Sequence, residues 1–222
     1  MHDLEHTWHA FLASPLHDLL HAPWADDPAF AMIAAHAGLR DSLGGPVQPA
    51  LNMARAWVQA RCGLDLLEVV RRRRPAIGLC LGFGMNTLEA YDFLQTLGLD
   101  CVHAYEWIAE HVVEAAQTLQ ALRAEMPCLP CRVRLHHGTI SDLRAMAEAS
   151  VQAIYTANVF TWEVPMTQLT FERAIQEIQR VLAPGGVVFS RGSAGVLEEH
   201  LTPYGQWLWR HDLVSVFQKQ TA

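Results

Sequence analysis

From residue 76 onward, short apolar runs alternate with longer segments in which apolar side chains recur at helical spacing. This alternation is typical of repeated strand and helix units around a parallel sheet, so the predicted fold class is α/β with helices on both faces. The apolar runs predict strands at 76–81, 101–105, 132–136, 153–158 and 186–190. The helical spacing predicts helices at 87–97, 108–125, 141–149 and 167–182. Two more runs, 206–210 and 213–218, predict a C-terminal antiparallel hairpin that turns near His211.

The first 75 residues have a different pattern, with helical stretches and no alternation typical of strands. Prolines and the Gly44-Gly45-Pro46 turn separate these stretches. We therefore expect a helical N-terminal segment, 1–75, and a second unit, 76–222, that holds the sheet. Apolar side chains such as Trp8 and Phe11 need a surface to cover. We expect the segment to form a lid and substrate-binding surface over the carboxyl ends of the strands, with a homodimer contact as the competing use.

Composition and charge narrow the class of protein. A chain of 222 residues, 51% of them hydrophobic, can bury a full core. No stretch approaches the roughly 20 apolar residues of a membrane span, and the first residues lack the pattern of a secretory signal. We therefore expect a cytoplasmic protein with no membrane partner. A net charge of −7 argues against a nucleic-acid partner, because phosphates bind to basic surfaces.

The segment 77-IGLCLGFGMN-86 ends a predicted buried strand on two glycines and then leads into a helix. Gly82 and Gly84 suit a loop that turns sharply and wraps closely around a ligand at the helix N-terminus. Glu106 follows Gly84 by 22 positions, at the end of the next strand. A carboxylate there can accept hydrogen bonds from two ribose hydroxyls. The loop and the acid together favour an adenosine-containing ligand.

These residues resemble those of the class I S-adenosylmethionine-dependent methyltransferases, and the resemblance spans about 76–191. It implies a Rossmann-like sheet and S-adenosylmethionine as the cofactor. The loop 82–84 matches the family's glycine-rich loop, with Phe83 between the two glycines. Cys80 stands where the family has an acidic residue, and Asn86 stands where it has a third glycine.

The resemblance also implies contacts to the adenosine half of the cofactor. Glu106 matches the family's ribose-binding acid. We expect the neighbouring Trp107 to line the pocket, either stacked on the adenine or facing a planar or cationic acceptor. The segment 136-HHGTISDL-143 resembles the loop that cups the adenine, which implies an adenine role for Thr139 and Ile140.

Two later segments carry the rest of the resemblance. The segment 154-IYTANVFTWEVP-165 resembles the fourth strand and its following loop, where the methyl acceptor meets the sulfonium. Asn158 in this segment is expected to line the cofactor site. The helix, turn and strand in 174-AIQEIQRVLAPGGVVFS-190 are the most specific match.

The implied activity is methyl transfer, and we expect the acceptor to be an oxygen or nitrogen of a small molecule. Because the sulfonium is already an excellent leaving group, the protein mainly has to hold the acceptor in line and exclude water. Where a general base is used, the candidates by position are Glu163 and His137, with His136 as the neighbouring alternative.

Two other functions stay open at this point. One is an enzyme that uses the same cofactor to transfer an aminopropyl arm or to close a ring. The other is a non-catalytic cofactor-binding module, which the replaced acids at Cys80 and Thr139 suggest. A dinucleotide-dependent enzyme is disfavoured, because only one mononucleotide-binding half is visible in the sequence.

No metal site is predicted. His17 and His21 lie one helical turn apart, a spacing that can hold a metal ion, but the sequence shows no third ligand near them. Cys128 and Cys131 fall between a predicted helix and the following strand. We interpret them as part of a connecting loop, because a redox pair of this spacing should open a helix after a strand.

Overall fold

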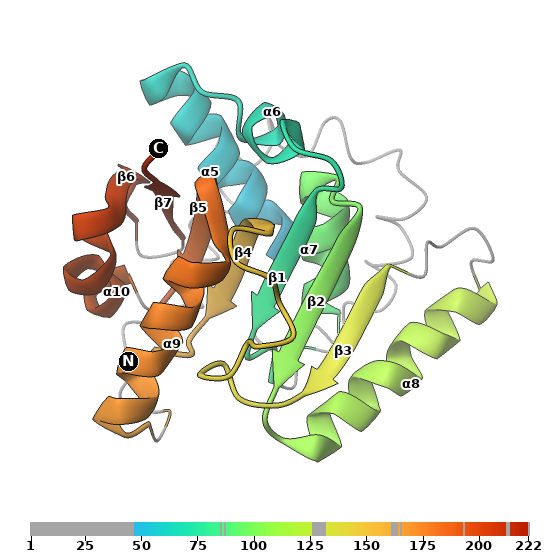
Figure 1. The fold of residues 1–222 in the computed structure, drawn as a ribbon. Helices are drawn as coiled ribbons and strands as arrows, with labels where there is room; N and C mark the ends of the chain where they lie inside the picture. The colour runs from blue at the N-terminus through green and yellow to red at the C-terminus, as the bar shows by residue number, and fades with distance from the viewer. Residues whose placement is uncertain are drawn as a thin grey trace.

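One seven-stranded sheet organises the molecule (Figure 1). The computed structural model describes residues 47–84, 86, 88–125, 132–160, 164, 166–192, 194–211 and 214–221. The strands are β1 (Ile77–Leu81), β2 (Cys101–Glu106), β3 (Val133–His137), β4 (Val151–Ala157), β5 (Leu182–Arg191), β6 (Gly205–Trp209) and β7 (Ser215–Lys219). Their order across the sheet is β3-β2-β1-β4-β5-β7-β6.

The first five strands run parallel, and β7 lies antiparallel between β5 and β6. Leu81 of β1 pairs with Tyr105 of β2 and with Thr156 of β4, so these strands end together at one edge of the sheet. This architecture confirms the predicted α/β class, with a mostly parallel sheet and a C-terminal antiparallel hairpin.

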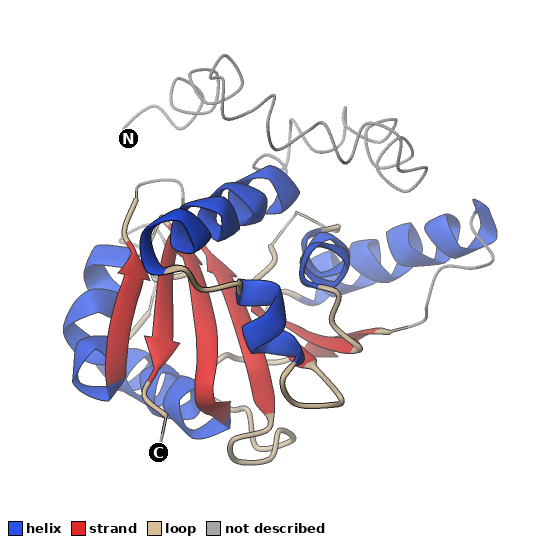
Figure 2. Ribbon diagram, turned by 90° about the horizontal axis from the view of Figure 1, so that it is seen from above, coloured by secondary structure: helices blue, strands red, loops and turns tan. Residues whose placement is uncertain are grey.

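Helices cover both faces of the sheet (Figure 2). One face is covered by α5 (Val47–Cys62), α6 (Leu66–Arg71), α7 (Glu89–Leu97) and α8 (Ala109–Glu125). The other face is covered by α9 (Gln168–Val181) and α10 (Ala194–Leu201), and a short 3-10 helix, η1 (Thr202–Tyr204), follows α10. Each face has its own cluster of buried apolar side chains, because strands of a parallel sheet are apolar on both sides.

Helix α7 packs against the centre of the sheet and positions the loop that precedes it. The fully buried ring of Phe93 lies 5.6 Å from Tyr155 of β4 and 6.4 Å from Phe189 of β5, measured between ring centroids. The helix ends at Gly98, whose φ of 59° is the left-handed conformation that glycine adopts without strain. The packed position of α7 fixes the path of the loop between the end of β1 and the first turn of this helix.

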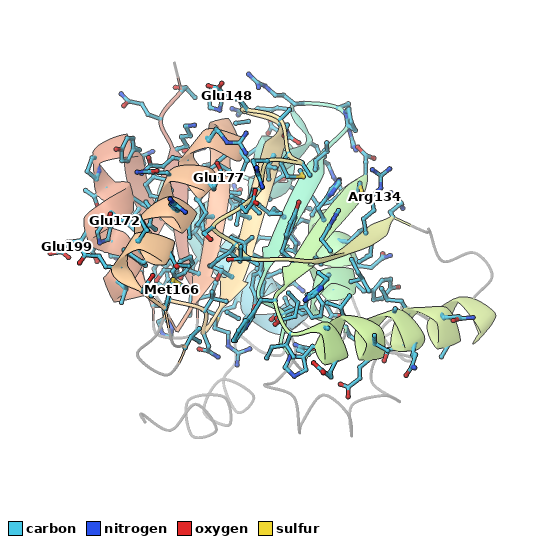
Figure 3. The ribbon with its side chains drawn as sticks, turned by 60° about the horizontal axis from the view of Figure 1, so that its bottom comes forward. Arg134, Glu148, Met166, Glu172, Glu177 and Glu199 are labelled. Carbon is cyan, nitrogen blue, oxygen red and sulfur yellow. The ribbon has the colours of Figure 1, made fainter. Side chains whose placement is uncertain are left out.

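The prediction of a helix at 141–149 is wrong, because this segment forms turns instead (Figure 1). Its backbone makes a turn, with the N–H of Met146 donating to the carbonyl of Leu143, and further bonds join it to α9. Glu177 accepts a bond from the backbone N–H of Leu143, and Arg180 donates to the carbonyls of Leu143 and Met146. Figure 3 shows Glu177 on α9. Leu143 and Met146 pack into the apolar cluster on this face, and their helical spacing in the sequence produced the wrong prediction.

Other elements differ less from the expectation. Helix α10 was not predicted, and β5 begins at Leu182, four residues before the expected start at 186. Helices α5 and α6 belong to the predicted N-terminal segment, and their apolar side chains join the same core as α7. Residues 1–46, which include His17, His21 and most of the expected lid, lie outside the described residues.

Candidate cofactor and active site

A cavity of about 540 Å³ opens at the carboxyl ends of β1, β2, β4 and β5. In a parallel sheet of this kind, ligands bind in the crevice outside these strand ends. All nine residues with expected cofactor roles line this cavity: Gly82, Phe83, Gly84, Asn86, Glu106, Trp107, Thr139, Ile140 and Asn158. The structure therefore brings them together, and their individual contacts to the cofactor stay predictions.

Glycine is required at the two positions of the loop after β1 for different structural reasons. Gly82 has a φ of 65°, and a Cβ there would lie 2.5 Å from Cγ2 of Val159. Gly84 has a φ of 55°, but a Cβ there would meet no atom within 4 Å, and the residue faces the cavity. Gly82 is needed for close packing against the loop after β4, whereas Gly84 leaves the backbone accessible to a ligand.

The carboxylate of Glu106 lies at the end of β2 and is only 3% exposed. One oxygen accepts a hydrogen bond from the backbone N–H of Gly84 at 2.8 Å, and the other accepts from that of Ile108 at 2.9 Å. An ionised carboxylate has about four acceptor positions, so about two remain for the hydroxyls of a ribose. The open space at Gly84 and this oriented carboxylate fit the adenosine half of S-adenosylmethionine.

The part of the cavity where we expect the adenine is bordered by residues from the loops after β2 and β3. Trp107 is 59% exposed at the rim, an unusual exposure for a large aromatic side chain. Thr139, which is exposed, and Ile140, which is buried, also line the cavity. His111 of α8 also lines the cavity, with its Nδ1 atom 3.9 Å from Glu106 Oε1, and the sequence reasoning missed it.

Neither histidine considered as a general base lines the cavity. His137 is exposed and does not line the cavity, and its Nε2 lies 3.0 Å from the carbonyl oxygen of Trp107. His136 is stacked on Tyr105, and its Nε2 lies 2.9 Å from Nδ1 of His103. Partial burial lowers the pKa of His136 below its ordinary value. Glu163 lies outside the described residues.

A pair of buried charged residues at the other end of the cavity was also missed. Glu89, in the first turn of α7, is 3% exposed, and Arg191, at the end of β5, is 7% exposed. Burial raises the pKa of Glu89 to about 8, and the charge of Arg191 opposes this shift only in part. The thiol of Cys80 donates to Glu89 Oε2 at 3.7 Å, and burial, together with Glu89, raises the pKa of that thiol.

The fold and the cavity are those of a Rossmann-like enzyme that binds a nucleoside-containing cofactor, in which a glycine loop and an acid at a strand end face one crevice. The chain belongs to the methyltransferase domain family, whose model matches residues 76–190, more than half of the sequence. It is therefore an S-adenosylmethionine-dependent methyltransferase, as the sequence predicts, and S-adenosylmethionine is its cofactor. No curated protein sequence is significantly similar to this chain.

Solved structures share the fold at low sequence identity. An rRNA methylase from Streptococcus thermophilus is similar with a TM-score of 0.52 and 15% identity, over 79% of this chain and 99% of that one. A putative methyltransferase from Streptococcus mutans, in complex with SAH, has a TM-score of 0.50 and 13% identity, over 69% and 93%. The match to the YcgJ protein from Bacillus subtilis is weaker, with a TM-score of 0.43 and 18% identity, and this chain spans about half of that protein: the match covers 65% of this chain and 55% of that one.

Two features are absent from the described residues. No helix in these ranges is long and apolar enough to cross a membrane. No group of three or more histidine, cysteine, aspartate or glutamate side chains in the same ranges is placed to hold a metal ion. Cys128 and Cys131, like His17 and His21, lie outside the described residues.

Proposed function

We propose that this methyltransferase acts on an oxygen or nitrogen atom of a small, largely apolar or aromatic molecule. The observation that carries the proposal is the apolar border of the cavity beyond the cofactor loops. Val159, Val164 and Met166 line that part, between the end of β4 and the start of α9. Figure 3 shows Met166 just before α9. Side chains of this kind recognise a compact apolar body rather than a polyanion.

Charge and size support a small acceptor. Among the described residues that line the cavity, Arg191 is the one arginine or lysine, and it is buried. A nucleic acid requires a basic face that neutralises several phosphates, and the chain has a net charge of −7. A cavity of about 540 Å³ lies within the usual range of roughly 300 to 1,000 Å³ for small-molecule sites. The rRNA methylase from Streptococcus thermophilus shares the fold at 15% identity, and a shared fold does not determine the substrate of this chain.

The residues of the chain mainly bind and orient the two reactants, because the methyl group is already activated on the cofactor. When bound, S-adenosylmethionine supplies a methyl group on a sulfonium, which needs no further activation. The loop 82–84 and Glu106 hold the adenosine half, and the apolar side chains beside Val159 exclude water and orient the acceptor. We keep Glu163 as the proposed general base. His137, the second candidate from the sequence, does not line the cavity and therefore ranks below it.

We also propose that residues 1–75 supply the lid and the rest of the acceptor surface. Helices α5 and α6 of this segment pack against α7 and against strands of the sheet, and none of their residues lines the cavity. The proposed lid therefore falls to the part of the segment that precedes α5. A cytoplasmic location and a possible homodimer belong to the same proposal and rest on the sequence alone.

The test is an assay with two substrate pools. The purified protein is incubated with S-adenosylmethionine and either a set of small aromatic alcohols, phenols and amines or total ribosomal RNA, and products are read by mass spectrometry. We expect S-adenosylhomocysteine together with a methylated small molecule. Methylated RNA together with unmodified small molecules would contradict the proposed class of acceptor. Methylthioadenosine as the product would contradict methyl transfer as the reaction.

A further inference from the structure

The amino-acid end of the cofactor has no assigned partner among the residues discussed so far. The glycine loop and Glu106 account for the adenosine half, which lies over β1 and β2. Cys80 stands where the family has an acidic residue. A thiol buried in apolar surroundings stays neutral, and burial raises its pKa here, so it cannot replace a carboxylate as a partner for a cation.

The structure places another carboxylate beside that thiol. Glu89 lies nine residues further along the chain, in the first turn of α7, and its Oε2 is 3.7 Å from Cys80 Sγ. The side chain of Glu89 is almost completely buried and lines the cavity. A helix residue therefore presents its acid at the strand position where the sequence lacks one.

The position of this acid matches the extended shape of the cofactor. Glu106 is at the end of β2, and Arg191 is at the end of β5, three strands away and thus roughly 14 Å across the sheet. Glu89 lies between them, in contact with β1. An elongated ligand whose ribose contacts Glu106 brings its other end toward Glu89 and Arg191. That end of S-adenosylmethionine carries an ammonium and a carboxylate group.

We propose that Glu89 binds the α-ammonium group of the cofactor, in place of the strand acid that Cys80 replaces, with Arg191 oriented toward the α-carboxylate. This inference rests on the cofactor and not on the acceptor proposed above. A buried carboxylate and a buried guanidinium at one end of a cavity are suited to a zwitterion, because each ligand charge meets an opposite charge.

A second property follows from the surroundings of Glu89. The charged and titratable groups that act on it are Arg191 of β5, Cys80 of β1, Asp92 of α7 and Glu106 of β2, and Tyr155 of β4 lies close by. Burial is the largest effect and raises the pKa of Glu89 to about 8. In the protein without cofactor, Glu89 is therefore largely protonated at neutral pH. When the ammonium group binds, Glu89 ionises and its proton passes to the solvent.

The test compares three ligands by calorimetry on wild type and Glu89→Gln. S-adenosylmethionine and S-adenosylhomocysteine both carry the ammonium group, whereas 5′-methylthioadenosine lacks the amino-acid end. At pH 8 we expect Glu89→Gln to weaken binding of the first two ligands by about 10- to 100-fold and to leave the third unchanged. Retained binding of 5′-methylthioadenosine also shows that the variant is folded. Glu199→Gln, an exposed glutamate on α10, is the matched control (Figure 3).

The proton provides a second measurement that a merely structural role would not affect. In wild type, we expect affinity for S-adenosylhomocysteine to rise by up to about tenfold per pH unit between pH 6 and 8, and titrations in buffers of different ionisation enthalpy should report proton release. Both effects should be absent in Glu89→Gln. Equal weakening of all three ligands, or no weakening of any, would overturn the proposal.

A double variant tests the replacement directly. In Cys80→Asp combined with Glu89→Gln, the carboxylate is moved to the strand position. We expect S-adenosylhomocysteine affinity to return to within a few-fold of wild type. If this variant binds 5′-methylthioadenosine normally but stays weak for S-adenosylhomocysteine, Glu89 does not stand in for a strand acid.

Discussion

The buried carboxylate of Glu106 accepts a hydrogen bond from the backbone N–H of Gly84 at 2.8 Å, which joins the end of β2 to the loop after β1. These are the two features that we expect the ribose of the cofactor to contact at the same time. Because they hold each other in place, the loop and the acid are oriented before the cofactor arrives, and less conformational entropy is lost on binding.

The first prediction concerns this carboxylate. Glu106→Ala should weaken S-adenosylmethionine binding by about 1 to 3 kcal/mol, because charge-assisted hydrogen bonds to the ribose are lost. Isothermal titration calorimetry measures the change. Glu110→Ala, on the exposed side of α8, is the control and should bind normally. Unchanged affinity in Glu106→Ala would remove this residue from the site.

The second prediction separates the two glycines. Both have positive φ, so alanine at either position costs roughly 1 kcal/mol of backbone strain. At Gly82 the added Cβ also meets Val159 at 2.5 Å, whereas at Gly84 it meets nothing. We expect Gly82→Ala to lower the free energy of unfolding by about 2 to 4 kcal/mol and Gly84→Ala by about 1 kcal/mol.

Urea unfolding of both variants checks this difference. The double variant Gly82→Ala with Val159→Ala removes the contact and should recover part of the loss. Equal destabilisation by the two single substitutions would mean that the contact with Val159 does not matter.

The third prediction is a dependence of stability on pH that arises from Glu89. Its pKa is raised by burial to about 8 in the folded protein, against an ordinary value of 4.5. The folded state therefore binds more protons than the unfolded state, so this group makes stability fall as pH rises from about 4.5 toward 8. Glu89→Gln cannot ionise and should lack the fall, by an amount on the order of 4 kcal/mol at most.

Urea unfolding of wild type and Glu89→Gln at pH 5, 6.5 and 8, without cofactor, measures the effect. The variant should gain stability relative to wild type at each step. Parallel curves for the two proteins would show that Glu89 ionises normally in the folded state.

The fourth prediction concerns the turns at 141–149. Arg180 bonds to two backbone carbonyls of this segment and to both carboxylate oxygens of Glu177. Arg180→Ala leaves those carbonyls without this donor and should destabilise the protein by about 1 to 3 kcal/mol, a fall in Tm of roughly 2 to 10 °C. Arg144 is the control, since it also pairs with an acid but has an 87% exposed side chain. Arg144→Ala should leave Tm almost unchanged.

The fifth prediction tests the general base. Glu163→Gln should lower the methylation rate by about 10²- to 10⁴-fold, with activity partly recovered at higher pH, where the acceptor loses its own proton more readily. Rates across pH 6 to 9 measure this change. If the rate and its pH profile stay the same, the role passes to His137 or His136.

The fold could be predicted to the extent that each element carries its own pattern. The strands of the parallel sheet are short apolar runs, and the amphipathic spacing of α9 is unambiguous, so both were placed within a few residues. The turns at 141–149 could not be recognised, because Leu143 and Met146 have helical spacing, and the bonds from Arg180 that hold them come from 37 and 34 residues away. Local pattern does not contain that information.

The site divides in the same way. Gly82, Gly84 and Glu106 carry a local signal, because a glycine loop and an acid follow two successive strands, and all three line the cavity. Glu89 and Arg191 carry none. Glu89 reads as an ordinary acid at a helix start, and Arg191 as the end of a strand. Only the packing of α7 against β1 and β5 shows that both are buried at one end of the cavity.

The place of β7 in the sheet has a consequence for how the protein is made. β7 is synthesised after β6, yet it lies between β5 and β6 and pairs with both. While a ribosome is still translating this region, β5 presents an open edge and β6 has no neighbour to join. Exposed strand edges of this kind pair readily with other chains. The parallel part of the sheet therefore keeps an open edge at β5 until β7 docks and brings β6 with it.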